Sequence, residues 1–168
     1  MVYTHILVPT DFSPAASRAL EYAVAEATQH QAKLTLLHVL QHHPTTAVYY
    51  VKDAPQSGME YAEFGEKLPS LPAPPPQTIR HDYEEEALVR LHDLRPATFT
   101  GTWEAQVTVG EPATEIVALA DTLGVDLIVM ATHGRTGVPH FLLGSVAEKV
   151  VRHASCPVLT VRQRERQV

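Results

Sequence analysis

The sequence is poor in cysteine and has no long hydrophobic run, and each shortage excludes a class of protein. Cys156 is the only cysteine among 168 residues, so the chain cannot close an internal disulfide. No apolar run reaches the roughly 18 residues that a membrane-spanning helix needs, and no charged segment followed by an apolar stretch marks an export signal. We therefore expect a cytoplasmic protein that does not associate with membranes.

Basic side chains are also in the minority. The chain holds 13 Lys and Arg against 19 Asp and Glu, which gives a net charge of -6. A negative balance argues against nucleic acid as a partner, because the phosphate backbone attracts positively charged surfaces. The length suits one domain with a core of ordinary size, and we expect residues 1–168 to form it.

Two familiar phosphate-binding motifs are missing. The sequence contains no G-x-x-x-x-G-K-[ST], and no G-x-G-x-x-G follows its first apolar run. The usual dinucleotide-binding arrangement is therefore not predicted.

Short apolar runs alternate with helical periodicities along the chain. Strands are expected over residues 3–8, 33–40, 103–109, 127–130 and 157–161. Helices are expected over residues 13–30, with Ser13 as N-cap and Pro14 at the first helical position, 79–94, 113–123, ended by Gly124, and 145–154. The segment 41–78 is rich in proline and ends in LPAPPPQ, which is incompatible with a helix or a central strand, so we expect a surface insert there.

This alternation predicts an α/β fold. We expect a doubly wound, Rossmann-like sheet of five parallel strands in the order 3-2-1-4-5, with helices on both faces. The order reverses between the first and fourth strands, and ligands of open α/β sheets bind beyond the carboxyl ends of the strands at such a point. Two segments far apart in sequence should therefore meet there, namely residues 9–11 and 131–144.

The second of these segments lies within DLIVMATHGRTGVPHFLLGSV, residues 126–146, where a buried strand is followed by a glycine-containing loop and a helix start. Glycine lets the main chain approach an anion, and the first helical turn offers unpaired N–H groups. Arg135 would either neutralise phosphate or be solvated, and His133 would either polarise a phosphoryl group or stabilise the turn. Asp11 would either accept hydrogen bonds from a ribose or adenine or shape the turn before Ser13.

Three histidines near the end of the second strand do not indicate a metal centre. His38, His42 and His43 straddle a strand end and a proline-rich segment without support from Cys or Asp. We therefore predict no metal site formed by protein side chains alone.

Ala131-x-x-Gly134, followed nine residues later by Gly144-Ser145, resembles the nucleotide-binding motif G-x-x-G-x9-G-[ST] of the universal stress protein family. The resemblance extends to ILVPTDFSPAASRALEYA, LTLLHV, DLIVMATHGRTG and LLGSVAEKVVRHASCPVLTV. It covers most of the chain except the insert 41–78, and it is loose over 79–109. The resemblance implies a fold of the adenine nucleotide alpha hydrolase type.

The resemblance also implies a binding site for ATP or another adenine nucleotide, with Mg²⁺ or Mn²⁺ arriving on the phosphates. It places Pro9, Thr10 and Asp11 at the adenosine and the backbone of Val39 at adenine. Gly134, Arg135, Gly144, Ser145 and Val146 would hold the phosphates. The flanking Met130, Ala131 and His133 are assigned to the same site.

A dimeric stress-response module regulated by ATP is the function that the resemblance implies, with dimers formed through residues 157–161. No general base or arginine finger is identifiable, so we assign no catalytic residue, and a slow ATPase remains an alternative. A dimeric interaction protein that binds no nucleotide is the other alternative. It is kept open by Ala131, which stands where the motif has its first glycine. If that backbone requires φ > 0, the methyl group costs on the order of 1 kcal/mol.

Overall fold

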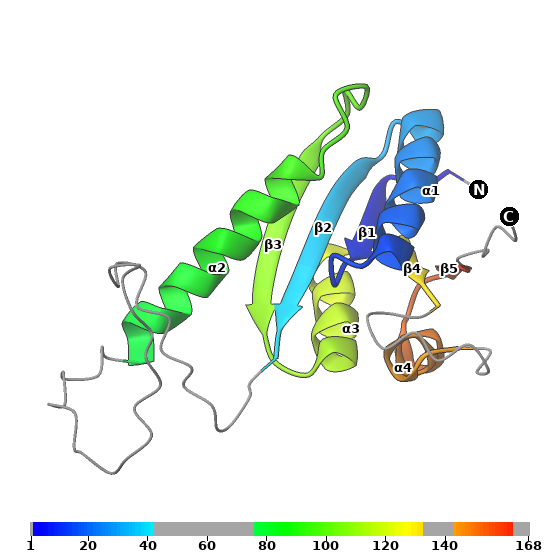
Figure 1. The fold of residues 1–168 in the computed structure, drawn as a ribbon. Coiled ribbons are helices and arrows are strands. Elements are labelled where there is room, and N and C mark those ends of the chain that lie inside the picture. The colour runs from blue at the N-terminus through cyan, green and yellow to red at the C-terminus, as the bar shows by residue number, and fades with distance from the viewer. Residues whose placement is uncertain (1, 42–75, 133–142, 163–168) are drawn as a thin grey trace, which may run out of the picture.

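A computed structural model describes residues 2–41, 76–132 and 143–162 of the chain (Figure 1). The strands are β1 (His5–Pro9), β2 (Lys33–Leu40), β3 (Trp103–Val109), β4 (Leu127–Ala131) and β5 (Val158–Val161). The helices are α1 (Pro14–His30), α2 (Pro76–Asp93), α3 (Pro112–Leu123) and α4 (Ser145–His153). Within these ranges, no helix is both long enough and apolar enough to cross a membrane.

The five strands form one parallel sheet in the order β3-β2-β1-β4-β5. The predicted fold class and strand order are therefore confirmed. The chain builds outward from β1 to β3 and then returns to place β4 on the other side of β1. As a result, β1 has β2 and β4 as neighbours, and the order of the sheet reverses between β1 and β4.

The two faces of the sheet have separate cores, because successive side chains of a strand point to opposite faces. Ile6 and Val8 of β1 pack toward α1 and α2, in a cluster that includes Leu91. Leu7 lies between them in sequence and packs on the other face, toward α3 and α4, with Ile116. Since both faces are covered, β1 and β4 are apolar along almost their whole length.

Local signals set the ends of two helices as predicted. The Ser13 hydroxyl accepts a hydrogen bond from the amide of Ala16 at 3.2 Å, and Pro14 begins α1, where its missing N–H would have had no intrahelical partner. Gly124 ends α3 with φ of 62°, in the left-handed conformation that glycine adopts at low cost. α1 ends in the same way, but with Gln31 at φ of 56°.

The beginning of α2 differs from the prediction. The helix starts at Pro76, three residues before the expected position 79, so the prediction that the whole run LPAPPPQ excludes helix was wrong at its last proline. Proline is tolerated in the first turn of a helix, where no N–H is needed for the hydrogen-bond ladder. The expected insert therefore ends at residue 75 rather than 78, and the part of it from 42 to 75 lies outside the described residues.

Candidate functional site

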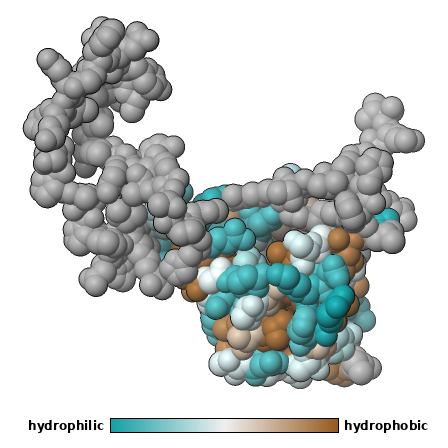
Figure 2. All heavy atoms as spheres, turned by 90° about the horizontal axis from the view of Figure 1, so that it is seen from below, coloured by the Kyte–Doolittle hydropathy of each residue, from teal (hydrophilic) through white to brown (hydrophobic). Residues whose placement is uncertain are grey.

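The carboxyl ends of β1 and β4 lie side by side at the point where the strand order reverses. The two strands pair in parallel, with Ile6 opposite Leu127 and Leu7 opposite Ile128. Pro9 at the end of β1 and Ala131 at the end of β4 therefore reach the same edge of the sheet. Figure 2 looks onto this edge and shows hydrophobic and hydrophilic side chains interspersed over the described part.

The first loop at this edge, residues 10–13, is held by three hydrogen bonds from its own amides. The amide of Thr10 donates to the carbonyl of Leu37 in β2 at 2.8 Å, and the amide of Phe12 donates to the Thr10 hydroxyl at 3.0 Å. The amide of Ser13 donates to the Asp11 carboxylate at 3.0 Å. Asp11 therefore shapes the turn, as one of its two predicted roles requires, and its half-buried side chain also lies at the edge where a ligand is expected.

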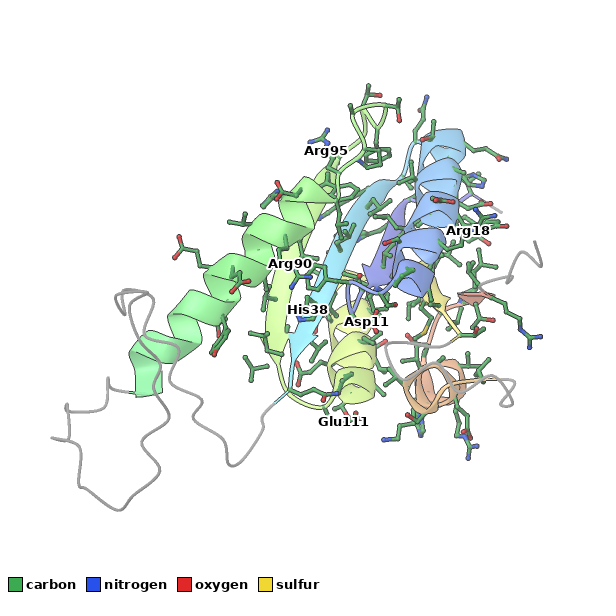
Figure 3. All side chains as sticks on the ribbon, viewed as in Figure 1. Asp11, Arg18, His38, Arg90, Arg95 and Glu111 are labelled. Atoms are coloured by element: carbon green, nitrogen blue, oxygen red, sulfur yellow. The ribbon has the colours of Figure 1, made fainter. Side chains whose placement is uncertain are left out.

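Side chains from β2 and α2 pack against Phe12 of this loop, and no local sequence pattern predicts this contact. The Phe12 ring lies 4.5 Å from the His38 ring of β2, measured between centroids, and the Arg90 guanidinium carbon of α2 lies 3.9 Å from the Phe12 centroid. His38 Nδ1 is 2.8 Å from the carbonyl oxygen of Thr10. Figure 3 shows Arg90 and His38 directed toward the end of β1, where Asp11 lies.

Ala131, the departure from the glycine motif, causes no backbone strain. It is the last residue of β4 and pairs with Val161 of β5. Among the described residues other than glycine, only Phe12 and Gln31 have a positive φ. An alanine is therefore compatible with the backbone at this position. Its predecessor Met130 is buried in the core on the α3 and α4 side.

The chain returns to the same edge where α4 begins. The amide of Gly144 donates to the carbonyl of Thr132 at 2.6 Å, so the start of α4 is tied to the residue that follows β4. Gly144 is the N-cap and, in the described structure, no side chain caps this helix, whereas Ser13 caps α1 and Glu111 caps α3. The first amides of α4, including those of Ser145 and Val146, therefore face the edge without a side-chain acceptor from the cap.

An ion pair joins the start of α3 to the middle of α4. Lys149 Nζ lies 3.0 Å from a carboxylate oxygen of Glu111. The Glu111 carboxylate also accepts hydrogen bonds from the amide of Thr114, at 2.8 Å, and from its hydroxyl. These bonds, with that of the amide the strongest, lower the pKa of Glu111 to about 2, so this side chain is ionised at neutral pH.

Nine of the twelve predicted site residues lie in the described structure. Val39, near the end of β2, is half-buried and packs on the α3 and α4 side. His133, Gly134 and Arg135 lie outside the described residues, so their predicted contacts remain predictions. Pro9, Thr10, Asp11, Val39, Met130, Ala131, Gly144, Ser145 and Val146 belong to the ends of β1, β2 and β4, to the loop after β1 and to the start of α4. Sequence reasoning missed Phe12 and Arg90, because nothing local indicates that residues so far apart in the chain pack together.

Comparison with known proteins shows similarity over nearly the whole chain. The model of the universal stress protein family matches residues 2–162. Universal stress protein MJ0577 of Methanocaldococcus jannaschii is 30% identical over 166 residues, which cover 98% of both chains.

Solved structures show the same fold. The structure of MJ0577 superimposes with a TM-score of 0.73 at 28% identity, over 98% of this chain and 99% of the other. A universal stress protein in complex with cAMP has a TM-score of 0.61 at 24% identity, over 98% of this chain and 100% of the other. The protein from Archaeoglobus fulgidus in complex with dAMP has a TM-score of 0.53 at 22% identity, over 95% and 98% of the two chains. At these last two identities, the similarity establishes the fold alone.

Proposed function

The chain belongs to the universal stress protein family. We propose that it binds an adenine nucleotide, with ATP as the preferred ligand, at the carboxyl ends of β1 and β4. One observation carries the proposal. The hydrogen bond from the Gly144 amide to the Thr132 carbonyl fixes the N-terminus of α4, which has no side-chain cap, at the edge where the Asp11 loop also lies. A helix N-terminus attracts phosphate through its amides and its partial positive charge, and a carboxylate accepts hydrogen bonds from a ribose or a base.

In this proposal, the two sides of the edge bind different parts of the nucleotide. Asp11 accepts a hydrogen bond from ribose or adenine, and the backbone of Val39 contacts adenine. The amides of Ser145 and Val146 bind phosphate oxygens, together with Gly134 and Arg135. Mg²⁺ or Mn²⁺ binds with the phosphates, since such ions are held largely by phosphate oxygens and water.

Two proteins with this fold were solved with cAMP and with dAMP. Both ligands contain an adenine base, a sugar and one phosphate. They support adenine as the base and the fold as a suitable scaffold, and the family resemblance of the glycine motif supports ATP among the adenine nucleotides.

The melting temperature in the presence of nucleotides tests the proposal. A ligand present at 100 times its Kd stabilises the folded state by about 2.7 kcal/mol, so ATP with Mg²⁺ is expected to raise the melting temperature by several degrees. GTP at the same concentration serves as the control for the base, and AMP as the control for the phosphates. The absence of any shift at millimolar ATP would contradict the proposal.

ATP binding without efficient turnover is the activity we favour over hydrolysis. The Asp11 carboxylate and the first amides of α4 are groups suited to binding a nucleotide. The alternative of a slow ATPase requires in addition that Asp11 or a nearby group accelerates attack on the γ-phosphate. Phosphate release measured for the wild type and for Asp11→Ala decides between them. Equal rates in the two proteins would remove the ATPase alternative.

We further propose that the protein is a cytoplasmic, single-domain regulatory module that works as a homodimer through residues 157–161. β5 lies at one end of the sheet, with β4 as its partner, and an open strand edge can pair with a second copy. Leu159 of β5 and Val151 of the adjacent α4 are exposed hydrophobic side chains. Sedimentation at micromolar concentration is expected to give the mass of a dimer. The mass of a monomer would contradict the proposed dimer and leave the proposal of nucleotide binding unaffected.

A further inference from the structure

Phe12 has a backbone conformation that is unfavourable for its side chain. Its φ is 63°, in the left-handed region that bulky residues rarely adopt. Such a conformation persists only where the surroundings hold it, and it is common at functional sites. Phe12 lies directly after Asp11, so whatever holds Phe12 also determines where the Asp11 carboxylate lies.

His38 supplies the first of these contacts, from β2. Its side chain lies on the α1 and α2 face, between Leu37 and Val39, which pack on the other face. Because a carbonyl oxygen only accepts hydrogen bonds, His38 Nδ1 must carry the proton that it donates to Thr10 at 2.8 Å. The same imidazole packs against the Phe12 ring. His38 thus contacts the residue before Asp11 and the residue after it.

Arg90 supplies the second contact, from α2. Its guanidinium carbon lies 3.9 Å from the Phe12 centroid, well within the range of a cation–π interaction. Arg90 is an exposed residue, so its charge stays hydrated while one face of the guanidinium covers the ring. Phe12 is therefore held by His38 from β2 and by Arg90 from α2.

We propose that His38 and Arg90 are positioning residues for the nucleotide site, which act through Phe12 to hold the Asp11 carboxylate in the orientation that binds the ligand. This inference rests on the proposed function and deepens it, since it extends the site to α2, an element outside the family's glycine motif. It also implies that bound nucleotide and the packing of α2 on the Asp11 loop stabilise each other, because linkage between two such equilibria is reciprocal.

A double-mutant cycle with ATP tests the inference. Arg90→Met removes the charge but keeps most of the apolar stem, and it is expected to weaken ATP binding about threefold. His38→Ala removes a hydrogen bond and a ring contact and is expected to weaken it about tenfold. In an Asp11→Ala background, both substitutions are expected to change the Kd by less than about twofold, because a residue that acts through Asp11 has no effect once Asp11 is gone.

Arg18→Met is the matched control. Arg18 also lies near an aromatic ring, with its guanidinium carbon 5.6 Å from the Tyr22 centroid, but it projects from α1 and pairs with Glu21. This control is expected to bind ATP as the wild type does. Arg90→Lys, which retains a cation, is expected to recover part of the affinity that Arg90→Met loses.

Amide exchange in the protein without nucleotide gives a second readout. The Ser13 amide donates to Asp11, so its exchange reports how firmly the carboxylate is held. Exchange at Ser13 is expected to be about threefold faster in Arg90→Met and unchanged in Arg18→Met. An unchanged Ser13 rate in Arg90→Met, or losses of affinity that simply add in the Asp11→Ala background, would overturn the inference. A wild type that does not bind ATP would instead refute the proposed function, and with it the role of these residues in nucleotide binding.

Discussion

Gly144 and Thr132 are joined by a backbone hydrogen bond of 2.6 Å that ties the start of α4 to the end of β4. The two residues delimit the segment that contains the predicted glycine loop. Because β4 lies next to β1, this bond also holds the N-terminus of α4 near the Asp11 loop. It fixes the position at which a phosphate would meet the helix, and this position leads to the first prediction.

Replacing Gly144 is expected to change stability and nucleotide binding in opposite directions. Gly144 has φ of -72° and ψ of 157°, which any residue adopts. Aspartate is a better N-cap than glycine, so Gly144→Asp is expected to raise the free energy of unfolding by a few tenths of a kcal/mol. Its carboxylate would repel phosphate, and we expect ATP affinity to fall by at least about tenfold. Urea denaturation and ATP titration measure the two effects.

Gly144→Asn is the neutral control for that experiment. Asparagine caps a helix about as well as aspartate but carries no charge. It is expected to give the same gain in stability and a smaller loss of affinity. Equal ATP affinity in Gly144→Asp and the wild type would show that the phosphates do not bind at α4.

Two substitutions of Asp11 separate its role in the turn from its role toward the ligand. Asp11→Ala leaves the Ser13 amide without its acceptor and is expected to lower the free energy of unfolding by about 1 kcal/mol. Asp11→Asn keeps an oxygen acceptor for that amide, so stability is expected to stay close to the wild type. Both variants lose a charged acceptor, and both are expected to bind ATP at least about tenfold more weakly. If Asp11→Asn binds ATP with wild-type affinity, the negative charge of Asp11 makes no contribution to ligand binding, and its role is to shape the turn.

The left-handed ends of α1 and α3 give a pair of opposite stability predictions. Gln31 adopts φ of 56° and is exposed, so Gln31→Gly is expected to stabilise the fold by about 0.5 kcal/mol. Gly124 adopts φ of 62°, and a methyl group there would meet no atom within 4 Å. Gly124→Ala is therefore expected to cost about 1 kcal/mol through backbone conformation alone. Denaturation midpoints at unchanged m-value measure both, and shifts of the same sign would contradict the argument.

Stability is expected to depend on pH through Glu111. Its pKa falls from 4.5 to about 2 on folding, so its contribution is complete above the unfolded value and is lost as pH falls from about 4.5 to 2. Because the side chain is half-exposed, Glu111→Gln is expected to cost only about 0.5–1 kcal/mol at pH 7. Melting temperatures of the two proteins are expected to converge toward pH 2. A constant difference from pH 7 to pH 2 would assign the effect to another group.

Local sequence signals predicted most of the architecture because they act over a few residues. Ser13 and Pro14 favour a helix start and Gly124 favours a helix end, since both effects depend on main-chain groups of the same segment. The alternation of strands and helices, together with the handedness of crossovers, then left the observed strand order as the favoured one. That order was sufficient to bring residues 9–11 to the edge where β4 ends.

The start of α2 shows where local reasoning becomes ambiguous. A run of prolines excludes the interior of a helix but is compatible with its first turn. Pro76 could therefore precede the helix or begin it, and its position in the run does not distinguish the two. In the structure, the helix begins at Pro76.

The sequence by itself determined the strand order, the start of α1, the end of α3 and which segments follow β1 and β4. Only the tertiary structure decided how that site is held. Phe12 adopts its left-handed conformation beside His38 and Arg90, which come from β2 and α2. The pKa of Glu111 is lowered mainly by the nearby Thr114 amide, and Lys149 of α4 lowers it further. Likewise, the extended backbone of Ala131 follows from pairing with Val161. Such contacts depend on how separate elements pack against each other, and the sequence of a single segment does not determine that packing.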